Sequence, residues 1–290
     1  MNRRVIVLSG ISLIAVSVFL PRPVGAGAWG QLTGVKTDDD VITIESLLDE
    51  MIDRDPVACF PENNFRLKQH SSYSRESKTP DDPEGWFMNH DFNRSPEDKN
   101  FIRIEETGGQ KEWVLMDHEG AGAIVRTWMP FRSVPENSLI RFYFDGAEQP
   151  TIEGNVCTLL NGTGLIPYPF AHSSLLSAVS FFPIPYAKRC KVTVTQPPFF
   201  FQFTFREYAE GTSVKTFTLE DFDAAKGLIE KVGKILLNPL EAKAGQPLGF
   251  HATLEKNAET SVELPQGAAA VRGLSVKLGS YEDPAVTRRV

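Results

Sequence analysis

The chain has 290 residues, of which 41% are hydrophobic, and its formal net charge is −7. This hydrophobic content supports a packed core in one large domain or two smaller ones. The basic residues are spread along the chain without forming a cluster, so we expect no nucleic acid as a partner.

Residues 1–26 have the pattern of a secretory signal peptide. Arg3 and Arg4 precede an apolar run over residues 5–20, and small residues end at Ala26. We predict cleavage after Ala26 and export to the periplasm or the exterior. The alternative is a membrane anchor, but the run is shorter than the about 20 residues that span a bilayer. No later stretch is long and apolar enough to span, so we expect no stable membrane insertion.

Residues 27–60 are predicted to form a polar leader followed by a helix. Thr43 can cap a helix over residues 44–53, where apolar residues recur at i, i+3, i+4, i+7 and i+8. Asp55-Pro56 then ends the helix, because the residue before a proline avoids the helical conformation.

The next segment, residues 61–100, is rich in Pro, Ser, Asn and Asp and is predicted to be a long loop. Its aromatic residues are more frequent than in disordered tails, so we interpret it as an ordered, functional loop. Polar side chains beside aromatic rings suit sugars, whose hydroxyls need hydrogen-bond partners and whose C–H faces pack on rings. The equally weighted alternative is a well-packed loop in which its Arg and Asp bond each other. The candidate sugar-binding residues here are Tyr73, Arg75, Trp86, Asn89 and Asp91.

Residues 61–218 are predicted to form one antiparallel jelly-roll sandwich, in a chain that is mainly β. Phenylalanine-rich runs suit strands that are buried in such a sandwich. Asp145-Gly146 indicates a tight turn. The strands are predicted at residues 101–105, 111–116, 123–129, 138–144, 191–195 and 199–206.

A linking helix is predicted over residues 219–240, where Thr218 and Asp221 resemble a capping box. Strand patterns resume in residues 241–290, which repeat part of the pattern around residues 122–128. We therefore predict the incomplete start of a second jelly roll there. The alternative is a chance similarity between two small-residue turns.

No sequence pattern indicates a metal site. The five histidines show no ligand spacing, and the zinc-protease, Walker and nucleophile-elbow motifs do not occur. Cys59, Cys157 and Cys190 are too widely spaced for a metal site. They are equally consistent with one disulfide plus a free thiol and with three small buried side chains.

Six motifs occur in an order that resembles glycoside hydrolase family 172, formerly the domain of unknown function 2961. The resemblance runs from about Ile44 to the C-terminus. The motifs are Ser-Ser-Tyr-x-Arg (71–75), Trp-Phe-x-Asn-x-Asp (86–91), Asp-x-Glu-Gly-x-Gly-Ala-Ile-Val-Arg-x-Trp (117–128), Arg-Phe-Tyr-Phe-Asp-Gly (141–146), Phe-Pro-Ile-Pro-Tyr-Ala-Lys-Arg-Cys-Lys (182–191) and Phe-x-Phe-Arg-x-Tyr (203–208).

The resemblance implies a double jelly roll that assembles as homotrimers or hexamers. It implies hydrolysis or transfer of furanosides, such as fructofuranosides and arabinofuranosides, by two glutamates with retention. A furanoside-containing glycan is then the expected partner, and no metal or organic cofactor is expected. Glu119, in the third motif, joins the candidate substrate-binding residues.

Three departures from the family pattern weaken the enzyme interpretation. Ser74 stands where the family has Asp, and Ala121 stands where it has Pro. The Gly-Thr-Gly-x-Glu-Asp-Tyr-like stretch of the second jelly roll, associated with the catalytic carboxylates, does not occur. We therefore expect a chain truncated before its catalytic glutamates, whose catalytic residues are unknown.

Two alternatives to an enzyme stay open. One is a non-catalytic carbohydrate-binding or structural module, and the other is a gene remnant that never accumulates as a folded protein. A new catalytic pair drawn from Glu105, Glu106, Glu112 and Glu119 would need its two carboxyl groups about 5 Å apart.

Overall fold

The structure is a computed structural model of the whole chain. It describes residues 5–9, 14–21, 41–53, 65–79, 81, 84–86, 100–130, 137–239, 245–253, 259–264 and 273–278. The chain divides into two compact units, one of residues 37–238 and one of residues 1–36 with 239–290.

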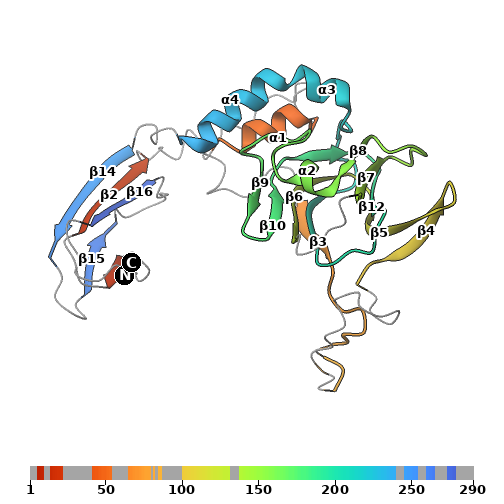
Figure 1. The fold of residues 1–290 in the computed structure, drawn as a ribbon. Helices are drawn as coiled ribbons and strands as arrows, with labels where there is room; N and C mark the ends of the chain where they lie inside the picture. Colours follow the sequence, from red (N-terminus) through yellow and green to blue (C-terminus); the bar gives the residue numbers. More distant parts are fainter. Residues whose placement is uncertain are drawn as a thin grey trace. The chain divides into compact units, whose positions relative to one another are not determined.

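Residues 37–238 form an antiparallel sandwich of two sheets, which confirms the predicted fold class (Figure 1). The chain passes repeatedly from one sheet to the other, as in a jelly roll. One sheet has the order β3 (Phe65–Ser71), β13 (Gln202–Tyr208), β6 (Gly122–Pro130), β10 (Ser177–Ser180) and β9 (Ala171–Ser174), and β11 (Ile184–Tyr186) also pairs with β6. The other has the order β4 (Arg103–Thr107), β5 (Gln110–Glu119), β12 (Arg189–Val194), β7 (Leu139–Phe144) and β8 (Ile152–Asn155).

Aromatic rings from both sheets fill the core between them. Phe201, Phe203 and Phe205 on or beside β13 are almost fully buried. The ring of Phe203 meets the ring of Phe142, on β7 of the opposite sheet, edge-on at 6.4 Å between centroids. Burying one such ring stabilises the fold by about 1.5–3 kcal/mol. The phenylalanine-rich runs therefore hold the two sheets together.

Helices pack beside the sandwich and close its core. In α1 (Ile44–Glu50), the Thr43 hydroxyl accepts a hydrogen bond from the Ser46 amide at 3.2 Å, and the Ser46 hydroxyl accepts one from the Thr43 amide at 2.9 Å. The predicted cap at Thr43 is therefore present. A short helix, α2 (Val156–Leu160), follows β8.

The predicted linking helix consists of two helices, α3 (Leu219–Ala224) and α4 (Lys226–Leu237), which meet at Ala225. The Thr218 hydroxyl caps α3 by accepting the Asp221 amide at 3.0 Å, as the sequence predicts. Phe222 and Ile229 pack into the core between the helices and the sheets. α1 and α4 lie against each other on the same side of the sandwich (Figure 1).

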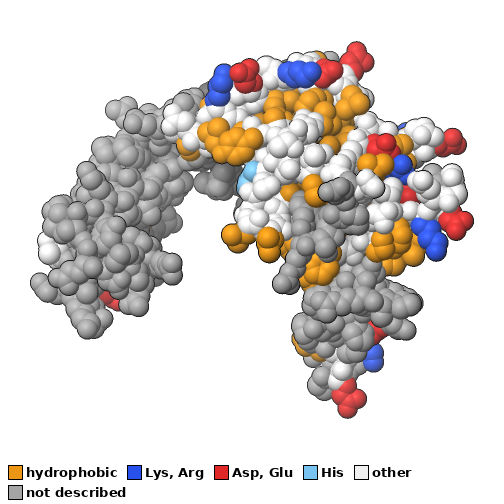
Figure 2. Space-filling model, viewed as in Figure 1, with side chains coloured by type: hydrophobic (Ala, Val, Ile, Leu, Met, Phe, Trp, Pro, Cys, Tyr) orange, Lys and Arg blue, Asp and Glu red, His pale blue; other side chains and the backbone are white. Residues whose placement is uncertain are grey.

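Several strands were not predicted from the sequence. β3 lies inside the predicted loop of residues 61–100, and β8, β9, β10 and β11 are only three or four residues long. A tight turn joins β9 to β10, and the side chains of Leu175 and Leu176 in this turn are exposed. Figure 2 shows hydrophobic side chains at this turn and near α4 on the visible face.

The second unit contains five described strands in two small antiparallel sheets. β2 (Ile14–Pro21) lies between β14 (Gly245–Ala252) and β16 (Gly273–Leu278), and β1 (Val5–Ser9) pairs with β15 (Glu259–Glu263). The segment whose sequence resembles a signal peptide therefore supplies two of these strands. Among the helices of the described residues, none is long and apolar enough to cross a membrane.

The thiols described in the sandwich are both free. Cys190 is buried in the core and Cys157 is partly exposed, while Cys59 lies outside the described residues. Cys190 thus serves as a small apolar core residue, and burial raises the pKa of its thiol.

One carboxylate is buried within the sheet that contains β5. Glu112 is 1% exposed, and it accepts hydrogen bonds from Arg141 at 2.5 Å, Thr193 at 2.5 Å and Tyr143 at 3.2 Å. Arg141 also pairs with Glu153 at 2.5 Å, but the Glu153 side chain is 43% exposed. The two carboxylates therefore contact the same guanidinium from a buried and from a solvated position.

We expect Glu112→Ala to lower the free energy of unfolding by about 3–5 kcal/mol, because it leaves a charged guanidinium and two hydroxyls without their buried partner. Glu153→Ala, the matched control on the same arginine, should cost at most about 1 kcal/mol. Urea unfolding followed by fluorescence measures both. Equal losses for the two variants would contradict the distinction between the buried and the exposed pair.

Candidate functional site

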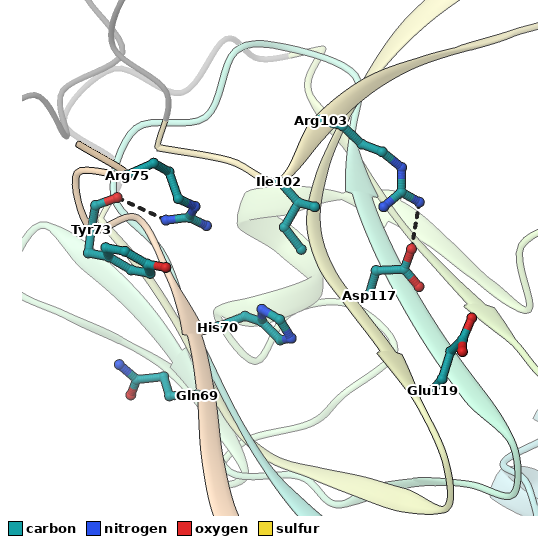
Figure 3. Close-up of a pocket in the computed structure, with 8 residues that line it drawn as sticks. All are labelled: Gln69, His70, Tyr73, Arg75, Ile102, Arg103, Asp117 and Glu119. Atoms are coloured by element: carbon teal, nitrogen blue, oxygen red, sulfur yellow. Dashed lines mark hydrogen bonds and ion pairs between the residues drawn. The ribbon is translucent and has the colours of Figure 1, made fainter. Parts of the chain in front are cut away.

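An open pocket of about 480 Å³ lies where β3, β4 and β5 approach one another (Figure 3). β3 and the turn that follows it form one wall, and the start of β4 with the end of β5 forms the other. The lining residues are Gln69, His70, Tyr73, Arg75, Ile102, Arg103, Asp117 and Glu119.

The first wall is held by a short turn after β3. The Ser72 hydroxyl accepts a hydrogen bond from the Phe201 amide at 3.1 Å, and the Ser72 amide donates to the Phe201 carbonyl. Arg75 then turns back and donates from Nη1 to the carbonyl oxygens of Ser71 and Tyr73, at 3.0 and 2.8 Å. Its Cζ lies 4.1 Å from the centroid of the Tyr73 ring. A guanidinium is thereby held over the face of a 56% exposed aromatic ring at the pocket.

The opposite wall is held by ion pairs around Asp117. Arg189 donates to its two oxygens from Nε and Nη2, both at 2.8 Å, and Arg103 donates from Nη2 at 2.5 Å. Burial alone would raise the pKa of Asp117, but hydrogen bonds from these two guanidiniums outweigh burial and lower the pKa below its usual value. Asp117 is therefore a fixed anion whose oxygens are already occupied.

A tight turn places Arg189 beside Asp117. Asp145 and Gly146 both have left-handed φ angles, 55° and 83°, as the Asp-Gly turn signal predicts. The Asp145 carboxylate accepts hydrogen bonds from the amides of Lys188 and Arg189, at 2.6 and 3.1 Å. The turn after β7 thus fixes the start of β12, from which Arg189 reaches Asp117.

Two histidines lie at and beneath the first wall. The His70 ring stacks on Phe205 with 5.4 Å between centroids. Burial, and then the charges of His118 and Arg75, lower the pKa of His70, so its ring is neutral at neutral pH. His118 is buried, and its Nδ1 lies 2.9 Å from the Tyr186 hydroxyl while its Nε2 lies 3.3 Å from Glu207.

Gly122 makes room for this buried contact. A Cβ atom at this position would lie 2.3 Å from the Tyr186 hydroxyl and 2.6 Å from the Arg206 carbonyl oxygen. Only glycine fits so close an approach. This requirement explains the second glycine of the Gly-Ala-Gly turn between β5 and β6.

The structure brings together three of the six sequence-predicted site residues, namely Tyr73, Arg75 and Glu119. Trp86 is described but does not line the pocket, and its side chain is 49% exposed. Asn89 and Asp91 lie outside the described residues.

Sequence reasoning missed Gln69, His70, Ile102, Arg103 and Asp117. Of these, only Asp117 could have been predicted from the sequence, by its spacing from Glu119. It lies two residues before Glu119, and residues two apart on a strand share one face. Arg103 joins the site through the hairpin of β4 and β5, whereas His70 joins it through the pairing of β3 with β13, which is distant in sequence. No group of acidic, histidine and cysteine side chains able to hold a metal ion occurs among the described residues.

The pairing of Asp117 predicts a specific pH dependence of stability. A carboxyl group whose pKa is lower in the folded state stabilises the fold above its unfolded pKa, and this stabilisation is lost as pH falls through the folded pKa. The unfolded pKa of Asp is about 3.9. We therefore expect the free energy of unfolding to fall more steeply below about pH 4 in the unmodified chain than in Asp117→Asn.

Urea unfolding between neutral and acid pH measures this difference. Glu119→Gln is the control, because Glu119 lies on the same strand face but is exposed and has no ion pair among the described residues. The acid sensitivity of this control should match that of the unmodified chain. An Asp117→Asn profile that superimposes on the unmodified one would contradict the proposed electrostatic role.

Comparison with known proteins relates the sandwich to one family. The model of the GH172 first beta-sandwich domain matches residues 63–225. No curated protein matches the chain. The matched segment is more than half of the chain and contains every lining residue of the pocket. The chain therefore belongs to glycoside hydrolase family 172.

Proposed function

We propose that this chain is an exported carbohydrate-binding protein whose pocket holds a sugar ring of a furanoside-containing glycan. Membership of a glycoside hydrolase family supports a carbohydrate as the partner. The observation that carries the proposal is the placement of the exposed Tyr73 ring beside Arg75, with Glu119 on the opposite wall (Figure 3).

Each of these groups has a distinct task toward a sugar. The Tyr73 ring offers an apolar face to sugar C–H groups. Arg75 has N–H groups beyond Nη1 that donate to ring or hydroxyl oxygens. Glu119 accepts from hydroxyls, since its carboxylate has no hydrogen bond or ion pair within the described part of the chain.

The pocket is better suited to binding than to cleavage. Retaining hydrolysis needs one protonated carboxyl group as acid and one free carboxylate as nucleophile. Asp117 is unsuited to be the acid, because Arg103 and Arg189 keep it ionised, and their three hydrogen bonds to its oxygens weaken it as a nucleophile. Glu119 is then the one carboxylate left in the lining. The alternative function is a retaining furanosidase of fructofuranosidase or arabinofuranosidase type, with carboxylates from outside this pocket.

Binding of methyl fructofuranosides and arabinofuranosides, measured by isothermal titration calorimetry, tests the proposal. Tyr73→Ala should weaken binding about tenfold, because stacked aromatic contacts contribute on the order of 1 kcal/mol beyond the area they bury. The matched control is Tyr168→Ala, which removes a comparably exposed tyrosine (61%) outside this pocket. Equal losses in the two variants would place the sugar elsewhere.

The same protein should show no hydrolysis of aryl fructofuranosides and arabinofuranosides at an enzymatic rate. Losing members of a catalytic set costs several orders of magnitude in rate. Release of the aryl group is followed by absorbance. Robust turnover that Glu119→Gln abolishes would refute the non-catalytic proposal and would make Glu119 a catalytic residue.

Export is proposed from the pattern of residues 1–26, with a mature chain that begins at Gly27. N-terminal sequencing of the protein recovered outside the cytoplasm measures this. Recovery of the chain in the membrane fraction with Met1 retained would contradict it. Assembly into homotrimers or hexamers stays a prediction from the family resemblance.

A further inference from the structure

Four arginines of the sandwich form ion pairs with carboxylates, and Arg75 differs from them because it has no such partner among the described residues. Arg103 pairs with Glu105 and Asp117, Arg189 with Asp117, Arg141 with Glu112 and Glu153, and Arg206 with Glu50. Arg75 has no carboxylate within ion-pair distance among the described residues. Its partners are two neutral carbonyl oxygens and the Tyr73 ring.

The charge of Arg75 is therefore only partly compensated. The side chain is about half-buried, and burial lowers the pKa of its guanidinium, whereas the pKa values of the four paired arginines are raised. Both hydrogen bonds that Arg75 donates within the described part of the chain use Nη1, so its other N–H groups are available (Figure 3). Desolvating a charge is costly unless a counter-charge pairs with it.

The rest of the pocket does not repel an anion near Arg75. His70 and Ile102 lie between Arg75 and the acidic wall in Figure 3. The negative charge of Asp117 is offset by Arg103 and Arg189. Glu119 is exposed to solvent, which screens its charge, and it lies on the opposite wall. One end of the pocket thus offers a cation with free donors, and the other end offers an acceptor for hydroxyls.

We propose that Arg75 selects sugars that carry an oxyanion, namely a carboxylate, phosphate or sulfate substituent. The free edge of its guanidinium donates two hydrogen bonds to two oxygens of the anion, a geometry that gives the strongest charge-assisted pairs. The sugar ring then packs on Tyr73 and extends its hydroxyls toward Glu119. This inference rests on the proposed function, because it assumes that the pocket binds a sugar ring.

The experiment uses the full chain and one furanoside in matched forms. Calorimetry compares methyl galactofuranoside with its derivatives at C6: the carboxylate, the phosphate and the sulfate. We expect at least one acidic form to bind about tenfold tighter than the neutral parent at low salt, and the preference to shrink as salt is added. The order among the three acidic forms identifies the source of the oxyanion.

Two variants assign the preference to Arg75. In Arg75→Gln the ratio of acidic to neutral affinity should fall to about one, and in Arg75→Lys it should be intermediate, because lysine keeps the charge but loses the planar fork. Arg66→Gln removes the same charge from an exposed position on β3 outside the pocket and should leave the ratio unchanged.

The outcomes separate the two proposals. Binding of the neutral furanoside with no preference for any acidic form would overturn this inference and leave the proposed function standing. A preference that survives in Arg75→Gln would also overturn it, since another group would then recognise the anion. Binding of none of the four galactofuranosides would overturn this inference, and the proposed function would fall with it only if the methyl fructofuranosides and arabinofuranosides also failed to bind.

Discussion

The pairing of Asp117 with Arg189 is the interaction on which the pocket wall depends. It joins β5 to the start of β12, and Arg103 extends it to β4, so three neighbouring strands meet at one carboxylate. Arg189 reaches that carboxylate because Asp145, in a left-handed turn, accepts the amides at the start of β12. A single aspartate-glycine turn therefore positions, by hydrogen bonds to backbone amides, the guanidinium that holds Asp117 at the pocket. The same pairing keeps Asp117 ionised and holds both of its oxygens in hydrogen bonds.

The opposite wall depends on close packing beneath it. Gly122 lets the Tyr186 hydroxyl approach the backbone, and that hydroxyl contacts His118 in the interior. The rings of His118 and His70 both pack on Phe205, so the position of His70 at the pocket follows from the core below it. Gly122 is buried and does not line the pocket, but its lack of a side chain permits the packing that positions His70. Ion pairs fix one wall, and steric fit fixes the other.

Features that depend on neighbouring residues could be predicted from the sequence. The caps at Thr43 and Thr218 and the turn at Asp145 are local hydrogen-bond or φ preferences, and each is present. β3 was missed because an edge strand with mostly exposed, polar residues shows no apolar alternation. The site divides in the same way. Tyr73, Arg75 and Glu119 stand out by residue type, whereas His70 reaches the pocket only through the pairing of β3 with the distant β13, which a single sequence does not reveal.

The proposed signal peptide and the proposed binding site lie in different units of the chain. β2, within the predicted signal peptide, pairs with β14 on one side and β16 on the other, so cleavage after Ala26 would oblige those strands to find other partners. Every lining residue of the pocket, and every ion pair that positions it, belongs instead to the unit of residues 37–238. The core of that unit is built from its own sheets and helices. The described lining of the pocket therefore contains no residue of the predicted signal peptide, whose described strands β1 and β2 pair only within the second unit.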